Sequence, residues 1–183
     1  MAVNRKLFTI EAFESFIANH PDQLFELING EIIEKVPTAE HAHIAGIISG
    51  EFHLYLKQRP QIKARFGVES RFRPEGDTGN DRMPDVFLRY TNAPRVKKGP
   101  VSGMPDVAVE IKSPEDTYRA MREKANYYLQ NGSQMVWLVY PDKQIVEIYQ
   151  NEVDIRILQP GDVIEGGAVL PDFTLPVDDV FEE

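Results

Sequence analysis

The sequence predicts a mixed α/β protein in which one β-sheet is flanked by helices, and three observations support this. The segment "LFELINGEIIEKV" at 24–36 has the pattern of a β-hairpin, and apolar stripes at helical spacing occur on either side of it. An extended segment, a helix and a second extended segment follow one another over 106–140, as in a crossover between parallel strands. No linker or long repeat divides the 183 residues, so we expect one domain over 1–183.

The N-terminal elements have clear boundary signals. Thr9 can cap a short helix, because apolar residues recur after it at helical spacing. Asn29-Gly30 between two apolar runs is the strongest two-residue signal for a hairpin turn. Thr38 can cap a second helix over about 40–58, which has an apolar stripe along one side.

The rest of the chain is predicted to form strands and one further helix. The strand "QMVWLVY" is nearly continuous in apolar residues, as expected when both faces of a strand are covered. The predicted elements are extended segments at about 62–73, 85–90 and 106–112, a helix at about 117–130, the strand 134–140, and an antiparallel pair formed by "QIVEIYQ" and "VDIRIL".

The composition excludes several kinds of site. There are no cysteines, which excludes disulfides, zinc–thiolate sites and thiol nucleophiles. The sequence contains no Gly-rich phosphate loop, Ser-His-Asp order or dinucleotide fingerprint. No apolar run approaches the ~20 residues of a membrane span, and the N-terminus lacks a signal-peptide core. We therefore expect a cytoplasmic protein without a membrane partner.

The charge is unevenly distributed along the chain. A formal net charge of −9 argues against a nucleic-acid partner. Residues 57–98, however, hold 11 of the 20 Lys and Arg residues and only 5 of the 29 Asp and Glu residues. Such a basic segment is either a strip that faces phosphates or a solvated surface, and charge alone does not decide between them.

The predicted strand 106–112 carries an unusual set of side chains. Alternation directs its branched apolar residues into the core and places Glu110 and Lys112 together on the opposite face. Charges near the end of a buried strand usually have partners or a ligand, although a plain ion pair on a half-exposed strand is the alternative. Asp106 lies roughly 13 Å from Glu110 along such a strand. Two ligands of one magnesium ion have oxygens within about 4 Å of each other, so Asp106 cannot share an ion with Glu110.

Asp85, in a separate predicted strand, is the better candidate, because strand pairing can bring it beside Glu110. With the main-chain carbonyl of Ile111, these carboxylates would make an all-oxygen partial shell suited to Mg²⁺ or Mn²⁺. Such an ion polarises a phosphodiester and lowers the pKa of its bound water. Lys112 could orient that water or neutralise charge on the phosphate. These residues therefore indicate a minimal phosphodiester hydrolase.

The same residues resemble a known family. Pro84-Asp85 and Glu110-Ile111-Lys112 match the PD-(D/E)xK nuclease signature, which is degenerate. The wider order of motifs, from about residue 8 to 180, is similar to that of a large bacterial family of restriction-endonuclease-like proteins in that superfamily. These motifs are "FELINGEIIE", "PTAEHAHIAGII", "MPDVFL", "PDVAVEIKSPED" and "REKANYYLQNGSQMVWLVYPDKQIVEIYQ".

The resemblance implies a restriction-endonuclease-like core, preceded by an N-terminal helix and a β-hairpin, with Asp85 and Glu110 as metal ligands. It also marks Lys124 as a candidate catalytic residue, in the helix that follows the signature strand. Many family members have an apolar residue at the position of Lys112 and keep the helix lysine, whereas this chain has both. We favour Lys112 because it shares the strand face of Glu110. The alternative for Lys124 is a solvated helix residue.

Further candidates lie in the predicted helix 40–58 and in the hairpin. Glu40-His41 matches the acid–His start of the family's first core helix, so either residue could hold the metal or its water. Helix-end charge and capping are the alternative for this pair. Glu26 and Glu31 belong to the hairpin, and one of them could approach the site unless both are ordinary strand charges.

Together these features predict a metal-dependent DNA endonuclease, with Mg²⁺ or Mn²⁺ as cofactor and DNA as partner. The resemblance also implies a homodimer. The rival hypothesis is a non-catalytic nucleic-acid-binding or regulatory module that retains the nuclease fold. The acidic net charge favours the rival, because binding of long duplexes profits from a broad basic surface.

Overall fold

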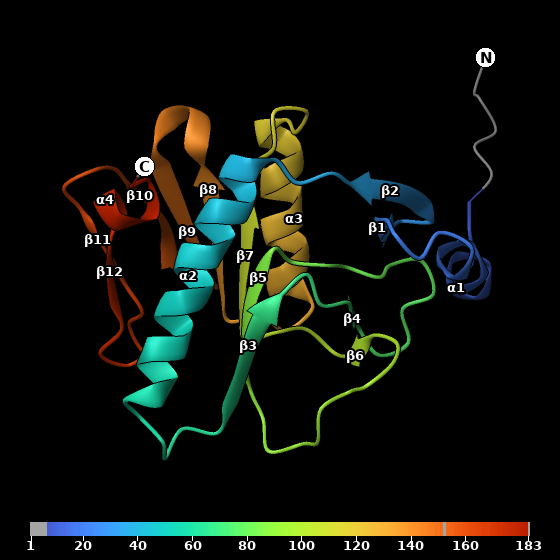
Figure 1. The fold of residues 1–183 in the computed structure, drawn as a ribbon, viewed down its shortest axis with the longest axis horizontal. Coiled ribbons are helices and arrows are strands. Elements are labelled where there is room, and N and C mark those ends of the chain that lie inside the picture. The colour runs from blue at the N-terminus through green and yellow to red at the C-terminus, as the bar shows by residue number, and fades with distance from the viewer. Residues whose placement is uncertain (1–6, 152, 183) are drawn as a thin grey trace.

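The computed structural model describes residues 7–151 and 153–182, and it shows the predicted mixed sheet flanked by helices (Figure 1). A six-stranded sheet has the order β10-β9-β8-β7-β5-β3. Only β7 and β8 are parallel, and the other neighbours in this sheet are antiparallel. Its strands are β3 (Ala64–Val68), β5 (Val86–Tyr90), β7 (Val107–Ile111), β8 (Met135–Tyr140), β9 (Ile145–Gln150) and β10 (Val153–Leu158).

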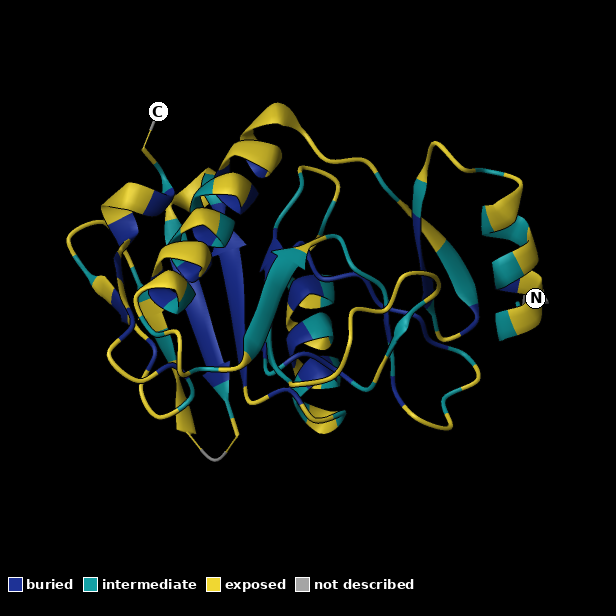
Figure 2. Ribbon diagram, turned by 60° about the horizontal axis from the view of Figure 1, so that its bottom comes forward, coloured by how far each residue is buried: buried dark blue, intermediate teal, exposed yellow. Residues whose placement is uncertain are grey.

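The parallel pair is joined by the predicted crossover through α3 (Tyr118–Gln130). The side chain of Thr117 caps α3 by accepting a hydrogen bond from the amide of Ala120. Met121, Ala125 and Tyr128 are buried on the side of α3 that faces the sheet. The β7 and β8 strands are buried throughout, which explains their nearly continuous apolar sequences (Figure 2).

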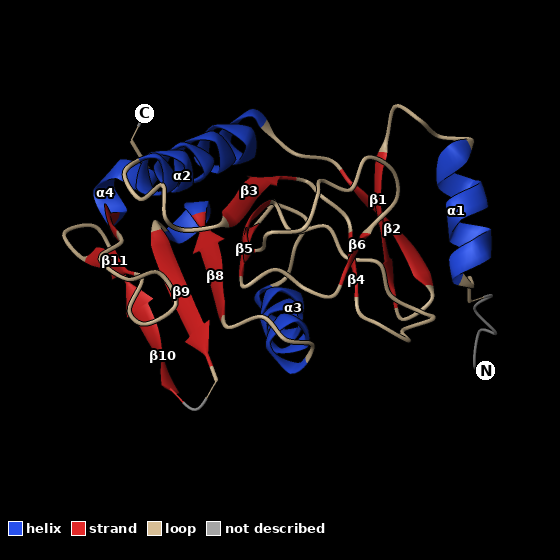
Figure 3. Ribbon diagram, turned by 90° about the horizontal axis from the view of Figure 1, so that it is seen from below, coloured by secondary structure: helices blue, strands red, loops and turns tan. Residues whose placement is uncertain are grey.

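The opposite face of the sheet is covered by α2 (Ala39–Lys57), as Figure 3 shows. Thr38 caps this helix, and Ile48 and Phe52 are fully buried beneath it. The Phe52 ring lies 5.4 Å from the ring of Trp137 on β8. The C-terminal segment adds β11 (Val163–Glu165), β12 (Thr174–Pro176) and α4 (Val177–Val180), whose buried residues belong to the same core.

The N-terminal elements lie beside the main sheet (Figure 3). They are α1 (Ile10–Ala18), capped by Thr9, and the hairpin β1 (Leu24–Ile28) and β2 (Glu31–Lys35). Asn29 and Gly30 both have positive φ, 51° and 81°, as a type I′ turn requires. Leu27 exchanges two backbone hydrogen bonds of 2.9 Å with Asp81. The hairpin is therefore tied to the segment that leads into Asp85.

The predicted extended segment 62–73 is not continuous. Its first part is β3, and its last two residues form β4 (Phe72–Arg73), which pairs in parallel with β6 (Val101–Ser102) outside the main sheet. The chain leaves the sheet at Glu69, which has a left-handed φ of 49°. The only other short element is a 3-10 turn, η1 (Pro141–Lys143), within the described residues.

Candidate active site

Strand pairing brings Asp85 beside Glu110, as the sequence predicts. Asp85 immediately precedes β5, and Val86 pairs with Val109 of β7. The Asp85 amide donates to the Val109 carbonyl at 3.0 Å, and the amide of Ile111 donates to the Asp85 Oδ2 at 2.6 Å. Asp106 lies at the other end of β7, where its carboxylate accepts hydrogen bonds from Tyr90 and Gln134. Asp106 is thus a strand-start residue.

Glu110 is 1% exposed, and its carboxylate faces α3. The hydroxyl of Tyr128 donates to its Oε1 at 2.7 Å, and the ammonium of Lys124 donates to its Oε2 at 2.7 Å. Tyr128 and Lys124 are four residues apart on α3 and so project from one side of the helix. Lys124 is therefore a partly buried partner of Glu110 and not a solvated helix residue.

Glu26 of β1 also reaches this site. Its Oε1 accepts hydrogen bonds from the amide of Met83 at 2.8 Å and from the Nε of Arg82 at 3.3 Å. Its Oε2 lies 3.6 Å from the ammonium of Lys124, which therefore stands between two carboxylates. The hairpin thus contributes Glu26 to the site, whereas Glu31 lies at the opposite side of the turn, in register with Ile28.

Lys35, the last residue of β2, is a site residue that sequence reasoning missed. Its ammonium donates to the carbonyl of Met83 at 2.6 Å and forms a short ion pair with Asp85. Arg82 was missed as well, although it is buried beside Glu26. Nothing in the sequence points to either residue, because the hairpin's position relative to the sheet is not encoded in any local pattern.

His41 lies in the first turn of α2 and reaches the same carboxylate. Its Nε2 is 3.0 Å from the Oδ2 of Asp85. The Nδ1 of His41 is buried and has no hydrogen-bond partner in the structure. Glu40, by contrast, is exposed, and among residues 7–151 and 153–182 no hydrogen bond or ion pair joins it to Asp85 or Glu110.

Lys112, which we favoured as the catalytic lysine, does not bring its ammonium to the carboxylates. The ammonium lies 3.5 Å from Asp142 and 5.3 Å from the centre of the Tyr118 ring. Lys112 does lie on the α3 side of the sheet, as Glu110 does, but its long side chain turns toward η1. The two predicted lysines therefore occupy different places, and only Lys124 contacts Glu110.

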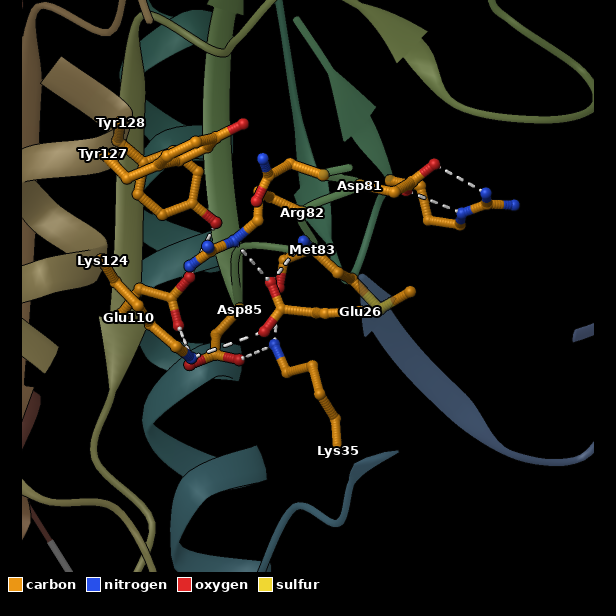
Figure 4. A network of polar contacts seen from close by, with 12 residues as sticks. Glu26, Lys35, Asp81, Arg82, Met83, Asp85, Glu110, Lys124, Tyr127 and Tyr128 are labelled. Atoms are coloured by element: carbon orange, nitrogen blue, oxygen red, sulfur yellow. Dashed lines mark hydrogen bonds and ion pairs between the residues drawn. The ribbon is translucent and has the colours of Figure 1, made fainter. Parts of the chain in front are cut away.

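Figure 4 shows the resulting carboxylate cluster, in which the buried acids Glu26, Asp85 and Glu110 converge with the buried Arg82 and the partly buried Lys35 and Lys124. We use this name for Glu26, Asp85 and Glu110 together with Lys35, Arg82, Lys124 and His41. Leaving the imidazole aside, the formal charges of the acids and cations cancel. This cancellation allows so many ionisable groups to be buried together, because an unpaired buried charge is very unfavourable.

The three carboxyl groups of the cluster differ in the direction in which their pKa values are shifted. Burial favours the neutral form of Glu26, but Lys124, Arg82 and Lys35 outweigh it and lower the pKa to about 2. Burial acts in the same way on Asp85, and Lys35 and His41 hold the pKa of that carboxyl well below its usual range. For Glu110, burial outweighs Lys124, and the nearby Asp85 adds to it, so the pKa is raised. Glu110 is therefore the most readily protonated of the three.

The donor chemistry of the cluster suits a hard divalent ion, because carboxylate oxygens are the ligands that Mg²⁺ and Mn²⁺ prefer. In the described ranges, however, no three His, Asp or Glu side chains are grouped so that they could hold a metal ion. The carboxylate oxygens are instead occupied by protein groups: Lys35 and His41 contact the oxygens of Asp85, and Lys124 and Tyr128 contact those of Glu110. An ion can enter only if some of these contacts rearrange.

Comparisons with known proteins agree with this architecture. A crystal structure described as a putative nuclease belonging to DUF820, from Anabaena variabilis ATCC 29413, matches with a TM-score of 0.78 and 25% sequence identity. The match covers 95% of this chain and 97% of that one. A search of curated proteins found no match. In the part of the chain that the structure describes, no helix is long and apolar enough to cross a membrane.

The family whose description reads "Putative restriction endonuclease", Uma2, matches residues 10–178. This range includes the hairpin, both main helices and every member of the carboxylate cluster. Both comparisons support a nuclease function, for which a nucleic acid is the substrate. The chain therefore belongs to the Uma2 family of restriction-endonuclease-like proteins.

Proposed function

We propose that this protein is a metal-dependent DNA endonuclease of the PD-(D/E)xK type, with the carboxylate cluster as its active site. The observation that carries the proposal is the meeting of Asp85 and Glu110 at adjacent strands, with the ammonium of Lys124 2.7 Å from Glu110. An acid pair with a lysine is what metal-assisted hydrolysis of a phosphodiester requires. DNA as the substrate and a homodimeric assembly are proposed from the resemblance of the motifs.

Asp85 and Glu110 would hold Mg²⁺ or Mn²⁺, and the Ile111 carbonyl remains the proposed main-chain ligand. The bound ion would supply polarisation of the phosphodiester and a lowered pKa for its water. His41 would fix the orientation of Asp85, since it contacts the Oδ2 at 3.0 Å.

Lys124 is now the better candidate for the catalytic lysine. It reaches Glu110, whereas the ammonium of Lys112 is held by Asp142. With a substrate bound, Lys124 would orient the attacking water or neutralise charge that develops on the phosphate. Glu26 would then act as a positioning residue for Lys124, because it lies 3.6 Å from the same ammonium.

A second function is favoured by one specific observation. The three carboxylates of the cluster are already balanced by Lys35, Arg82 and Lys124, so the site is electrostatically complete without a metal. A non-catalytic nucleic-acid-binding or regulatory module would need no more than this. Divalent-metal binding distinguishes the two functions, because only the nuclease requires it.

The test is cleavage of supercoiled plasmid in Mg²⁺ or Mn²⁺ by the unmodified protein and by the Glu110→Gln variant. Gln keeps the shape of Glu110 but removes its charge, so metal-dependent nicking should disappear while the fold persists. The matched control is Glu115→Gln, because Glu115 is exposed and follows the same strand. Full nicking activity in the Glu110→Gln variant would refute the assignment of the carboxylate cluster as the active site.

A further inference from the structure

A half-open cavity of about 540 Å³ lies along β5 and its neighbour β3, which is the edge strand of the sheet. Residues of the loop between β5 and β6 (91–100) form part of its wall. A volume of this size is typical of small-molecule sites. None of the carboxylate-cluster residues lines it. Its lining includes Arg65, Gly67, Phe87, Arg89, Arg95 and Val101.

Two arginines stand directly opposite each other in this cavity. Arg65 of β3 pairs in register with Arg89 of β5, so their side chains project from the same face of the sheet. Like charges placed directly opposite across a strand pair are destabilising. The third arginine, Arg95, lies on the covering loop, and no Asp or Glu is among the lining residues.

Within the described part of the chain, the arginines of this cavity lack carboxylate partners, as Arg59 and Arg156 do, whereas five other arginines have them. In residues 7–151 and 153–182, no ion pair joins a carboxylate to Arg65, Arg89 or Arg95. Arginines that do pair with carboxylates are Arg71, Arg73, Arg82, Arg119 and Arg122. The cavity is thus a concentration of positive charge without an internal counter-ion.

The guanidinium groups are held in place by the backbone. Arg65 donates to the carbonyl of Ala93 at 2.6 Å, and Arg89 donates to the carbonyl of Ser102 at 2.7 Å. A guanidinium has five N–H donors, so each group keeps donors for a ligand. A fixed arginine with a spare N–H is suited to an oxyanion, which can accept two parallel hydrogen bonds.

An apolar surface lies beside the charged one. Gly67 pairs in register with Phe87, and a Cβ atom at Gly67 would lie only 2.9 Å from the Phe87 ring. The absence of a side chain at Gly67 lets the ring of Phe87 lie against the backbone of β3. Phe87 and Val101 give the cavity an apolar wall beside the arginines. A ligand that combines an anionic group with a flat ring would complement both surfaces.

We propose that this cavity binds a nucleotide, whose phosphate lies between Arg65 and Arg89 and whose base contacts the apolar wall. The nucleotide is either free or part of a nucleic-acid strand. Asp85, Phe87 and Arg89 alternate along one strand, and Asp85 and Arg89 are roughly 13 Å apart along it. A strand that crosses the cavity can therefore continue toward the carboxylate cluster. The proposal goes beyond the nuclease function, because the cavity can bind phosphate whether or not the protein cleaves DNA.

The experiment measures binding of two probes in EDTA, where no cleavage can occur. One probe is AMP, and the other is a short fluorescein-labelled DNA strand. The double variant Arg65→Gln and Arg89→Gln should bind the relevant probe about tenfold more weakly, or worse, because a charged hydrogen-bonded contact is lost at each position. The control is Arg156→Gln, which makes the same type of substitution at one position on β10, at the opposite edge of the sheet.

Binding of AMP identifies a free nucleotide as the source of the phosphate, and binding of the DNA strand alone identifies the nucleic acid. Inorganic phosphate should compete with the probe on the unmodified protein, which gives a readout that requires no variant. If neither probe binds, or if Arg156→Gln weakens binding as much as the double variant, the proposal is wrong. A double variant that melts earlier but binds normally would show that the arginines only fasten the loop. Glu110→Gln should still bind, so a failed nuclease assignment would be distinguishable.

Discussion

Replacement of Lys35 by Met tests whether the carboxylate cluster depends on its internal cations. The ammonium of Lys35 is paired with Asp85, and the two side chains are 11% and 2% exposed. In Lys35→Met, Asp85 keeps His41 and the amide of Ile111 but loses its nearest full positive charge. The cluster then carries an uncompensated buried negative charge.

The magnitude follows from that loss. Removal of one partner from a buried ion pair costs about 3–5 kcal/mol of unfolding free energy. Since about 1 kcal/mol shifts the melting temperature of a protein of this length by about 2–4 °C, we expect a fall of roughly 6–20 °C in EDTA. Lys57→Met is the control, because Lys57 is exposed at the end of α2 and its loss should change stability by less than about 0.5 kcal/mol.

The same variant tests how the cluster accepts a divalent ion. In Lys35→Met, Mg²⁺ no longer competes with an ammonium for the Oδ1 of Asp85, so it should stabilise the variant more than the unmodified protein. A free ion concentration of about 100 times Kd would restore about 2.7 kcal/mol. Thermal and urea unfolding with and without Mg²⁺ provide the measurement. The reasoning is refuted if Lys35→Met melts with the unmodified protein in EDTA, or if Mg²⁺ stabilises both proteins equally.

Three further outcomes are expected. Lys124→Met should abolish plasmid nicking and Lys112→Met should retain most of it, because only Lys124 contacts Glu110; the reverse pattern would restore Lys112 as the catalytic lysine. Protonation of Glu26 should contribute to unfolding in acid, because its pKa of about 2 lies below its ordinary value. The ionised Glu26 side chain therefore stabilises the folded protein fully above about pH 4.3, and this stabilisation is lost as the pH falls toward 2. Glu26→Gln should therefore show a flatter decline in unfolding free energy over that pH window, and an unchanged slope would contradict the assigned shift. Gly30→Ala should lower the unfolding free energy by about 1–2 kcal/mol, because Gly30 has a φ of 81°; equal urea midpoints would count against a strained turn.

Much of the fold could be predicted because its signals are local. Thr9, Thr38 and Thr117 each accept a hydrogen bond from an amide three residues later, and this pattern is visible in the sequence. The meeting of Asp85 and Glu110 was also predictable, because strand geometry excluded Asp106 and left strand pairing as the route.

The remainder of the site depends on contacts between distant segments. Lys35 and Asp85 are 50 residues apart, and no local pattern shows that β2 ends against Asp85. The position of Lys112 on the strand did not predict where its ammonium lies, because its long side chain reaches Asp142 instead of Glu110. The break in the predicted strand at Glu69 was also missed, because it depends on the pairing of β4 with β6, which are distant in the sequence.

The two partners of Glu110 on α3 make the carboxylate cluster sensitive to the spacing of residues within that helix. Lys124 and Tyr128 face Glu110 only at one rotational setting of α3, and the buried side chains of Met121 and Ala125 hold the helix against the sheet at that setting. One residue inserted between Met121 and Lys124 would turn both partners by about 100° relative to Met121, because an α-helix has 3.6 residues per turn. Both partners would then leave Glu110 together. The spacing within α3 is therefore constrained along with the identity of the residues that it positions.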